Sequence, residues 1–264
     1  MASTSTQDRT PTALITGAAH GIGKAIALRL ASDGFNIAIN DIPSKEELLN
    51  EVAKEIRDRY GKKTAVVPCD VSEEGPVKEM IAKTAEVLGG LDVMVANAGI
   101  CITKPILQTE VSDWNKIMDV NAKSVFLCYK YAAEQMIKQG VGGRIIGASS
   151  VAGKRGTCAF PIYCASKFAV RGLTQAAAEE WGPHGITVNA YAPGYVETPL
   201  TYSCLIPGVA PNPGDFLKLG TTASVLGRVG TPDDIASMVA YLASKGAGFV
   251  TGQTLSINGG TFYD

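Results

Sequence analysis

The stretch that decides the fold is ALITGAAHGIGKAIALRL, residues 13–30. It opens with a short apolar, β-branched run that predicts a buried strand, and it closes with the apolar spacing of a helix. Gly17, Gly21 and Gly23 lie between them and permit a sharp turn with close approach of a ligand to the backbone. Glycine is common in any turn, but a strand before it and a helix after it favour a pyrophosphate site at the helix N-terminus. The residues assigned to this site are Gly17, His20, Gly21, Ile22 and Gly23.

The same alternation of strand and helix patterns continues along the chain. Nearly all-apolar strands are typical of a parallel sheet that is covered on both faces. We therefore expect a single α/β domain of the Rossmann-type, doubly wound class, with about seven parallel strands flanked by helices. The expected strands are Ala13–Thr16, Asn36–Asn40, Thr64–Pro68, Leu91–Ala96, Arg144–Ala148, Ile186–Ala190 and Thr254–Ile257. The expected helices are Gly23–Ser32, Lys45–Arg59, Val77–Leu88, Val125–Gln139 and Ile162–Glu180.

Length and composition favour one globular domain. The chain has 264 residues, of which 46% are hydrophobic and 19% charged, and its net charge is −1. This charge argues against a nucleic-acid partner or a polybasic membrane surface, and no run approaches the roughly 20 apolar residues of a membrane span. We expect a flexible polar tail over residues 1–10, a catalytic domain over residues 11–264 and, without a signal peptide, a cytoplasmic location.

Cysteine and histidine spacing does not predict a metal site. The six cysteines are scattered without a CxxC pair, and the two histidines, His20 and His184, are far apart in the sequence. Structural zinc needs clustered ligands of these types. We therefore expect no metal, and reduced cysteines that serve mainly as small core residues.

Residues at the ends of the next strands complete the expected cofactor site. Asp41 follows the second strand, where a carboxylate accepts hydrogen bonds from the adenosine ribose and repels a 2′-phosphate. Because His20, rather than Arg or Lys, precedes Gly21, we expect NAD(H) rather than NADP(H); the alternative for Asp41 is a capping role at the following helix. Asp70 and Val71 end the third strand, and Asp70 either reaches the adenine amino group or forms a turn. The fourth strand ends in small groove residues, Asn97, Ala98 and Gly99.

Tyr163 and Lys167 form the expected acid–base pair. They are spaced i, i+4 at the start of a long predicted helix, so the phenol and the ammonium lie on one face. A free tyrosine titrates near ~10, and a nearby cation lowers its pKa. We expect Lys167 and an oxidised nicotinamide together to bring the Tyr163 pKa toward neutrality, which requires about 4 kcal/mol. In carbonyl reduction, Tyr163 then delivers a proton to the oxygen as hydride adds to the carbon.

A tyrosine–lysine pair at this spacing is common by chance, so its context matters. Ser149 and Ser150 end the fifth predicted strand, just upstream of the pair. Ligands of such sheets bind outside the carboxyl ends of the strands. We expect Ser150 to donate a hydrogen bond to the developing oxyanion, a role worth several kcal/mol, with Ser149 as the alternative.

Together the motifs resemble the short-chain dehydrogenase/reductase family over Ala13–Gly260. They are TGAAHGIG at Thr16–Gly23, NAG at Asn97–Gly99, Asn121 within VNA, Ser150, YCASK at Tyr163–Lys167 and PGYVET at Pro193–Thr198. Within the family, the cofactor and scaffold segments are similar to acetoin (diacetyl) reductases, also described as 2,3-butanediol dehydrogenases. The family's usual NNAG reads Ala96-Asn97-Ala98-Gly99 here, which puts the hydrogen bonds of its first asparagine in doubt.

The resemblance implies a catalytic set of Asn121, Ser150, Tyr163 and Lys167, in which Asn121 positions a water that relays protons to Lys167. It also implies that Thr198 contacts the nicotinamide carboxamide and that the segment before it shapes the pocket of the ring. The residues concerned are Pro193, Gly194, Val196 and Thr198. Family members form dimers or tetramers through two long helices, so a homotetramer or homodimer is expected.

Residues 199–230 break the alternation and are rich in proline and glycine. A loop of this length is usually functional, so we expect a substrate lid rather than a variable surface excursion. The expected substrate residues are Ser150, Val151, Cys158, Phe160, Tyr195, Leu200, Tyr202 and Leu205. Because this set holds no Arg or Lys, we expect a small uncharged ketone or hydroxyketone such as acetoin or diacetyl. The alternatives are a 3-oxoacyl thioester, a sugar or polyol, a steroid, a secondary-metabolite ketone, or a dinucleotide sensor without catalysis.

Overall fold

Seven parallel strands form one sheet, in the order β3-β2-β1-β4-β5-β6-β7. The computed structural model describes residues 9–263. The strands are β1 (Thr12–Thr16), β2 (Asn36–Asn40), β3 (Thr64–Val66), β4 (Val93–Ala96), β5 (Gly143–Ala148), β6 (Ile186–Pro193) and β7 (Thr254–Ile257). Each coincides with an expected strand to within a few residues, and the predicted parallel sheet is confirmed.

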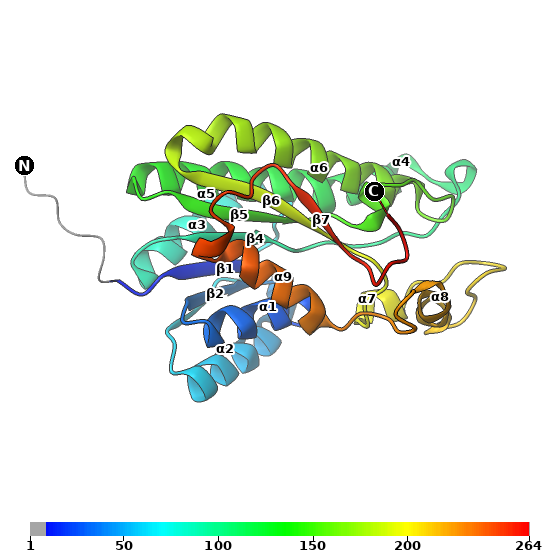
Figure 1. Ribbon diagram of the computed structural model, residues 1–264, viewed down its shortest axis with the longest axis horizontal. Coiled ribbons are helices and arrows are strands. Elements are labelled where there is room, and N and C mark those ends of the chain that lie inside the picture. Colours follow the sequence, from blue (N-terminus) through cyan, green and yellow to red (C-terminus); the bar gives the residue numbers. More distant parts are fainter. Residues whose placement is uncertain (1–8, 264) are drawn as a thin grey trace, which may run out of the picture.

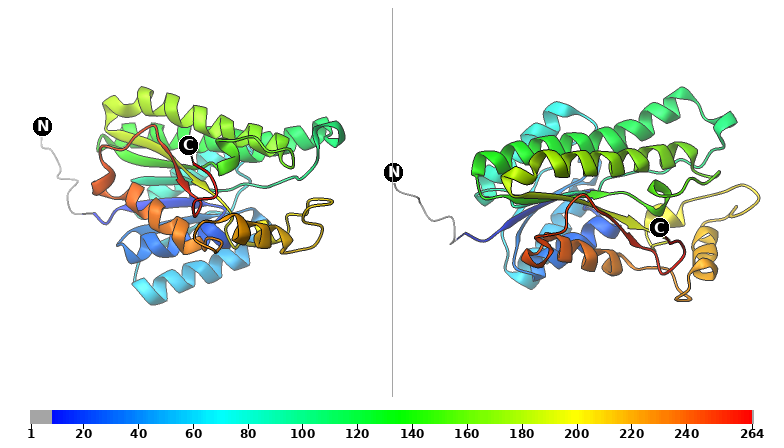
Figure 2. Two further views of the ribbon diagram at one scale, coloured as in Figure 1. Left: turned by 45° about the vertical axis from the view of Figure 1, so that its right-hand side comes forward. Right: turned by 45° about the horizontal axis from the view of Figure 1, so that its top comes forward.

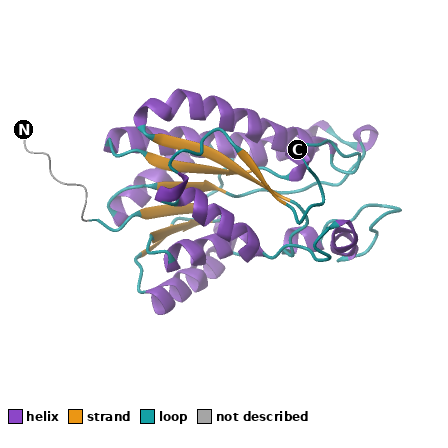
Figure 3. Cartoon of the chain, viewed as in Figure 1, coloured by secondary structure: helices purple, strands orange, loops and turns teal. Residues whose placement is uncertain are grey.

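Helices cover both faces of this sheet, as Figures 1 and 3 show. One face carries α1 (Gly21–Ser32), α2 (Glu46–Tyr60) and α9 (Pro232–Ala243). The other face carries α3 (Glu74–Leu88), α5 (Ser124–Gln139) and α6 (Pro161–Trp181). Single 3₁₀ turns are η2 (Pro43–Lys45), η3 (Ile106–Gln108), η5 (Val151–Gly153), η6 (Gly182–His184) and η7 (Lys245–Ala247).

The strand sequences explain why the sheet is buried on both sides. Leu14 and Ile15 are neighbours in β1 and both have no exposed surface. Successive side chains of a strand point to opposite faces, so Leu14 packs with residues of α3 and α5, whereas Ile15 packs with residues of α1 and α9. Each fully buried aliphatic side chain of this kind contributes about 1.5–3 kcal/mol. A strand with two apolar faces therefore belongs inside the sheet.

The strand order places a crevice at the carboxyl end of β1. The chain runs from β1 through β2 to β3 on one side, then returns to β4 on the other side of β1. In open α/β sheets, ligands bind where the order reverses in this way. The loops that follow β1 and β4 both open onto this crevice, and they contain the glycine turn and the NAG motif.

Four helices were absent from the sequence-based expectation. They are α4 (Val111–Met118), α7 (Pro199–Tyr202), α8 (Asp215–Ala223) and α9. Three of them begin with a capping box, which pairs Thr198 with Thr201 for α7. In the other two the partner is acidic, Glu110 with Asp113 for α4 and Thr231 with Asp234 for α9. Such boxes are readable in a sequence, so these two helices could have been found.

The segment expected as a loop at residues 199–230 is therefore partly helical, since it contains α7 and α8. Figure 2 shows that it projects beyond the carboxyl ends of the strands. Its two ends are joined, because Glu197 N donates to Gly230 O at 2.9 Å and Gly230 N donates to Tyr195 O at 2.8 Å. The excursion thus has a closed base beside β6.

The expected tail at residues 1–10 falls mostly on residues 1–8, which lie outside the described residues. Arg9 is described, and its Nη2 lies 2.6 Å from Asp92 Oδ1 in an ion pair. No helix within residues 9–263 has both the length and the apolar character needed to cross a bilayer.

Candidate active site

Two adjoining cavities lie at the carboxyl ends of the strands. The larger is a groove of about 320 Å³ at the crevice beside β1, and the smaller has a volume of about 230 Å³ and lies under α7 and α8. They share five lining residues, which are Ser150, Tyr163, Gly194, Leu200 and Thr201. The predicted acid–base tyrosine and its serine therefore lie where the two cavities meet.

The structure brings every residue assigned to the cofactor into the lining of the larger groove. These residues are Gly17, His20, Gly21, Ile22, Gly23, Asp41, Asp70, Val71, Asn97, Ala98, Gly99, Tyr163, Lys167, Pro193, Gly194, Val196 and Thr198. The groove also contains residues that the sequence did not single out, among them Ile42, Lys45 and Lys116.

The glycine turn leaves an open helix end in this groove. Gly17 and Gly21 have φ of +65° and +58°, a region that favours glycine. A Cβ added to Gly23 would lie 2.2 Å from the carbonyl oxygen of Gly17, so a side chain has no room there. At the N-cap of α1, His20 makes no side-chain capping bond, and the first turn has no acidic residue. The free N–H groups and the positive helix end fit a pyrophosphate.

Asn97 fastens the strand ends around the groove. Its Nδ2 donates to Thr16 O at 2.8 Å, and the Tyr191 hydroxyl donates to its Oδ1 at 2.7 Å. The amide therefore ties β1 and β6 to the end of β4. Because its side chain is engaged in these bonds, Asn97 holds the shape of the groove. Ala98 and Gly99 line the groove beside it with little or no side chain.

Asp41 lies at the adenosine end of the predicted site and is mostly buried. Its Oδ2 accepts a hydrogen bond from Ala19 N at 3.3 Å, and its Oδ1 accepts one from Ile42 N at 2.9 Å. The N-cap of α2 is Lys45, so the alternative in which Asp41 caps the helix is wrong. These backbone bonds fix the carboxylate on the groove wall.

A cation does lie beside this carboxylate, although the residue before Gly21 is His20 rather than Arg or Lys. Lys45 Nζ lies 3.5 Å from Asp41 Oδ1 and 2.8 Å from His20 Nε2. Burial and the neighbouring Lys45 lower the pKa of His20, whereas Asp41 raises it. A neutral imidazole can accept a hydrogen bond from the lysine ammonium, so the three side chains form one small network.

The side chain of Asp70 forms a turn, which was the alternative to an adenine contact. Its Oδ1 accepts hydrogen bonds from Ser72 N at 2.9 Å and from the Ser72 hydroxyl at 2.7 Å. This arrangement is a turn closed by an aspartate side chain. Asp70 still lines the groove next to Val71, but one of its two oxygens is taken by the turn.

Ser150, Tyr163 and Lys167 converge from two elements. Ser150 follows β5, and Tyr163 and Lys167 lie one turn apart near the N-terminus of α6. The Ser150 side chain lies close enough to the Tyr163 phenol to lower its pKa. Lys167 Nζ lies 5.6 Å from the centre of the Tyr163 ring and donates to Ala148 O at 2.8 Å. Ser149 is not part of this group, because its hydroxyl donates to Lys167 O.

Burial governs the pKa values of the Tyr163–Lys167 pair, and the expected lowering of the Tyr163 pKa by Lys167 together with an oxidised nicotinamide stays a prediction. Burial raises the pKa of Tyr163 above its ordinary value, and Ser150 offsets only part of this effect. Burial also lowers the pKa of Lys167 to about 8. The phenol is therefore protonated at neutral pH and is ready to act as an acid.

Asn121 lies in η4 (Asp119–Lys123), a π-helical turn between α4 and α5. The side chain is fully buried; its Oδ1 accepts from Ile100 N at 2.8 Å, and its Nδ2 donates to Ser166 Oγ at 3.2 Å. Asn121 lines neither cavity. A Cβ added to Gly99 would lie 3.3 Å from Asn121 Oδ1 and 3.4 Å from Lys167 Nζ, so both side chains border the same small space.

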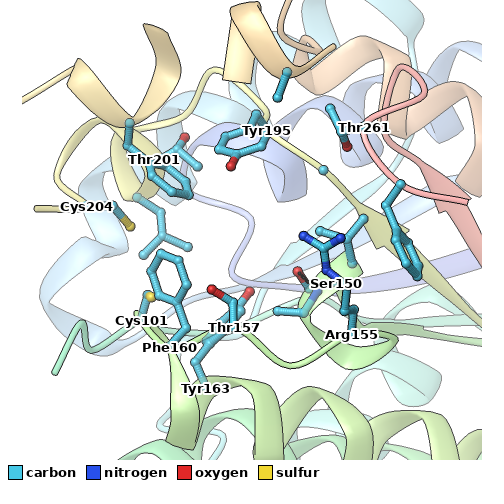
Figure 4. A pocket seen from close by; sticks show the side chains of 17 residues that line it. Cys101, Ser150, Arg155, Thr157, Phe160, Tyr163, Tyr195, Thr201, Cys204 and Thr261 are labelled. Atoms are coloured by element: carbon cyan, nitrogen blue, oxygen red, sulfur yellow. Dashed lines mark hydrogen bonds between the residues drawn. The ribbon is translucent and has the colours of Figure 1, made fainter. Parts of the chain in front are cut away.

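The smaller cavity contains five of the eight expected substrate residues, Ser150, Val151, Phe160, Tyr195 and Leu200 (Figure 4). The other three, Cys158, Tyr202 and Leu205, do not line it. Cys158 and Tyr202 are exposed on the surface instead. A position near the site in sequence is not enough, because the side chains of a loop or a short helix alternate between cavity and solvent.

Sequence reasoning missed several side chains of this cavity, which are Cys101, Arg155, Thr157, Cys204, Phe216 and Phe262. Phe216 comes from α8 and Phe262 follows β7, so only the folded chain brings them together. Arg155 overturns the expectation that the cavity holds no Arg or Lys. Its signal was the basic pair Lys154-Arg155 shortly after Ser150.

Comparison with known proteins decides the family. The family model described as enoyl-(acyl carrier protein) reductase matches residues 17–261. A short-chain dehydrogenase/reductase of Armillaria gallica is 49% identical over 265 residues, which cover 100% of both chains. The chain belongs to the short-chain dehydrogenase/reductase family. Like its relatives, this short-chain dehydrogenase/reductase is an oxidoreductase, and its family binds a nicotinamide dinucleotide.

Other relatives of this short-chain dehydrogenase/reductase carry different substrate names. The L-2,3-butanediol dehydrogenase of Corynebacterium glutamicum is 41% identical, over 96% of this chain and 98% of the relative. A 3-oxoacyl-[acyl-carrier-protein] reductase of Staphylococcus aureus is 39% identical, with the same coverage of both chains.

Among solved structures, acetoin dehydrogenase of Salmonella typhimurium has a TM-score of 0.84 and 36% identity, with 96% of both chains covered. A short-chain dehydrogenase of Burkholderia cenocepacia in complex with NADP has a TM-score of 0.85 and 31% identity, over 96% of this chain and 98% of that one. The structural resemblance therefore extends over nearly the whole short-chain dehydrogenase/reductase.

Proposed function

We propose that this enzyme uses NAD(H) to interconvert a small ketone or hydroxyketone and its secondary alcohol. The observation that carries the proposal is the position of Ser150 and Tyr163 in the lining of both cavities. A carbonyl group in the smaller cavity can reach both hydroxyls while its carbon faces the groove. The bound dinucleotide would supply or accept the hydride in that groove.

In this proposal the hydroxyls of Tyr163 and Ser150 both contact the carbonyl oxygen of the substrate. In reduction, Tyr163 donates its proton to the oxygen, since its raised pKa keeps the phenol protonated at neutral pH. Ser150 stabilises the same oxygen with a hydrogen bond as negative charge develops. A preorganised donor of this kind is worth about 3–4 kcal/mol in other enzymes. In alcohol oxidation the proton returns to Tyr163.

Asn121 and Lys167 complete the proposed path for the proton. Both border the small space beside Gly99 that an added side chain would fill. A water in that space would accept hydrogen bonds from Lys167 and donate one to Asn121. Lys167, whose pKa is lowered to about 8 by burial, can both lose and regain a proton near neutral pH.

Asp41 supports the choice of NAD(H). Its carboxylate is held on the groove wall by two backbone N–H groups and can accept hydrogen bonds from ribose hydroxyls. A 2′-phosphate would meet this negative charge. Lys45 reduces the repulsion, but its ammonium is already engaged by Asp41 and His20. NADP(H), which the Burkholderia neighbour binds, is the alternative.

The names of the relatives support small ketones as first substrates to test. One relative is a butanediol dehydrogenase and one structural neighbour is an acetoin dehydrogenase. The Staphylococcus relative supports a 3-oxoacyl substrate as the alternative. Absorbance at 340 nm with NADH and with NADPH, on diacetyl, acetoin and a β-ketoester, tests the proposal. Turnover on none of a wider panel of ketones and alcohols with either cofactor would overturn it.

We also propose that the protein is a homodimer or homotetramer in the cytoplasm. Phe126 on α5 and Phe168 on α6 are 45% and 42% exposed, and large apolar side chains on two neighbouring helices suit a subunit interface. The six free cysteines suit a reducing compartment.

A further inference from the structure

The smaller cavity contains one charged side chain among mostly apolar ones. Arg155 is the only lysine, arginine, aspartate or glutamate in its lining, as far as the described residues go. The aromatic and aliphatic part of the lining includes Phe160, Phe216 and Phe262. Figure 4 shows Arg155 on the same side of the cavity as Ser150, with Cys101 and Cys204 on the opposite side. A substrate held by Ser150 therefore has a cation close by.

Arg155 is held in place by its backbone and by a ring. Its backbone N donates to Val151 O at 3.0 Å, in the turn that directly follows Ser150. Its guanidinium carbon lies 5.4 Å from the centre of the Phe262 ring. A guanidinium stacked on an aromatic face keeps its N–H edges free for other partners. Burial raises the pKa of Tyr195 across the cavity, and the Arg155 charge lowers it.

Within residues 9–263, the guanidinium of Arg155 has no carboxylate and no hydrogen-bond acceptor as a partner. The two basic residues of the segment at residues 199–230 do have carboxylate partners. Lys218 lies 2.9 Å from Asp215, and Arg228 lies 2.7 Å from Asp234. Lys154, the direct neighbour of Arg155, donates to Ser256 at 2.9 Å. Unlike these three side chains, the guanidinium of Arg155 faces the cavity and is available to a ligand.

We propose that Arg155 binds a carboxylate of the substrate, so that the preferred substrates are oxo acids and the corresponding hydroxy acids. This inference rests on the proposed ketone reduction and names the class of ketone. The carbonyl would lie at Ser150 and Tyr163, the apolar middle of the molecule against the aromatic side chains, and the carboxylate at the guanidinium. A planar guanidinium matches a carboxylate with two parallel hydrogen bonds. No carboxylate in the cavity lining opposes an anion.

Binding of pentanoate and of pentanamide to the protein, measured by calorimetry with NADH present and with NADH absent, tests the subsite without turnover. The two probes share shape and length but differ in charge. We expect pentanoate to bind at least about tenfold more tightly than pentanamide, which corresponds to about 1.4 kcal/mol. Arg155→Met should abolish this difference, and Arg155→Lys should keep part of it because the charge remains without the fork.

Turnover gives a second measurement that separates this inference from the proposed function. The substrates are 4-oxopentanoate, 5-oxohexanoate and their methyl esters. We expect the ratio of kcat/KM for acid over ester to exceed about ten for the better chain length, and to fall about tenfold or more in Arg155→Met. The ratio should also decrease as salt is added, since the cation is partly open to solvent.

Lys154→Met is the matched control, because it removes the adjacent positive charge outside the cavity lining. Lys154→Met should leave the preference for pentanoate in binding and the preference for acids over esters in turnover unchanged. Reduction of the esters without any preference for the acids would overturn the carboxylate subsite while the proposed function stands. Absence of turnover on all four substrates would leave the calorimetry to decide, and equal binding of pentanoate and pentanamide by the unaltered protein would reject the subsite in every case.

Discussion

The ammonium of Lys167 lies 5.6 Å from the centre of the Tyr163 ring and donates to the carbonyl oxygen of Ala148. The cation thus acts on the ring and on the end of β5, and it makes no direct bond to the phenolic oxygen. Burial dominates the titration of both groups, raising the pKa of Tyr163 and lowering that of Lys167 to about 8. The protein alone keeps Tyr163 in its acid form.

Tyr163→Phe removes the proton donor and little else. We expect kcat for ketone reduction to fall by about 10²- to 10⁴-fold, the usual contribution of a positioned acid. The dissociation constant for NADH, followed by fluorescence, should change little because the ring remains. Activity within about tenfold of the unaltered enzyme would contradict the role assigned to the phenol.

Lys167→Met should inactivate the enzyme and stabilise it. The buried lysine has a pKa of about 8 in the folded chain, against an ordinary value of 10.5. Below about pH 8 the folded state carries the whole cost of the buried charge, and this cost disappears as the pH rises toward 10.5. The methionine variant should gain about 1–3 kcal/mol in free energy of unfolding at pH 7, after the lost hydrogen bond to Ala148 is deducted.

Urea unfolding at pH 7 and at pH 10 measures this difference. The advantage of the variant should shrink at the higher pH, because the native lysine is then neutral. A variant less stable than the native protein at pH 7 would show that the ammonium stabilises the fold, against the expectation.

Asp41→Asn should weaken discrimination against NADPH. The amide keeps the size of the side chain but no longer repels a 2′-phosphate. We expect the ratio of kcat/KM for NADH over NADPH to fall by about tenfold or more. Lys45→Met is the control with the opposite sign, because it removes the cation 3.5 Å from Asp41 and should raise the ratio. A native enzyme that prefers NADPH would refute the assignment of Asp41.

Gly99→Ala should block the space shared by Asn121 and Lys167. The new Cβ would lie 3.3 Å and 3.4 Å from their polar atoms, close enough to exclude a water between them. We expect kcat to fall by about 10- to 100-fold, with a melting temperature that shifts little. Gly172→Ala on α6 is the control, because no atom lies within 4 Å of its added Cβ. Full activity of Gly99→Ala would argue against a water-mediated path.

Phe126→Lys and Phe168→Glu should reduce the oligomer to smaller species in sedimentation. Both place a charge where an apolar face of α5 or α6 would be covered by another subunit. Leu48→Lys on α2 is a matched control, since Leu48 is 42% exposed on the opposite face of the sheet. An unaltered sedimentation coefficient in both variants would exclude this face as the interface.

Most of the scaffold was readable in the sequence because its signals are local. A strand such as β2 is apolar on two faces, and the glycine turn has a strand before it and a helix after it. Helices α4 and α9 were not predicted, although a capping box begins each of them. Helices α7 and α8 were not predicted because they have only four and nine residues, and because the proline and glycine of residues 199–230 are typical of a loop.

The cofactor groove was predicted better than the substrate cavity for a physical reason. Groove residues follow the ends of strands, whose positions the sheet fixes. The cavity is lined by residues from segments that are far apart in the sequence, such as Phe216 on α8 and Phe262 after β7. No local sequence pattern predicts that these segments come together. Lys45 and Arg155 show the same limit for charge. Lys45 ends the turn η2 and Arg155 follows η5, and only the folded chain places these two cations at the groove and at the cavity. The raised pKa of Tyr163 follows from burial, which spacing alone does not report.

The π-helical turn at Asp119–Lys123 makes the orientation of Asn121 depend on a single extra residue. Loss of one residue there would restore regular helical pitch and turn the asparagine by about 100° around the axis. The sheet, the glycine turn and Tyr163 would stay where they are. We therefore expect a one-codon deletion to move the amide away from the space that it borders together with Lys167. Such a deletion would leave a dinucleotide-binding fold without the proposed proton path.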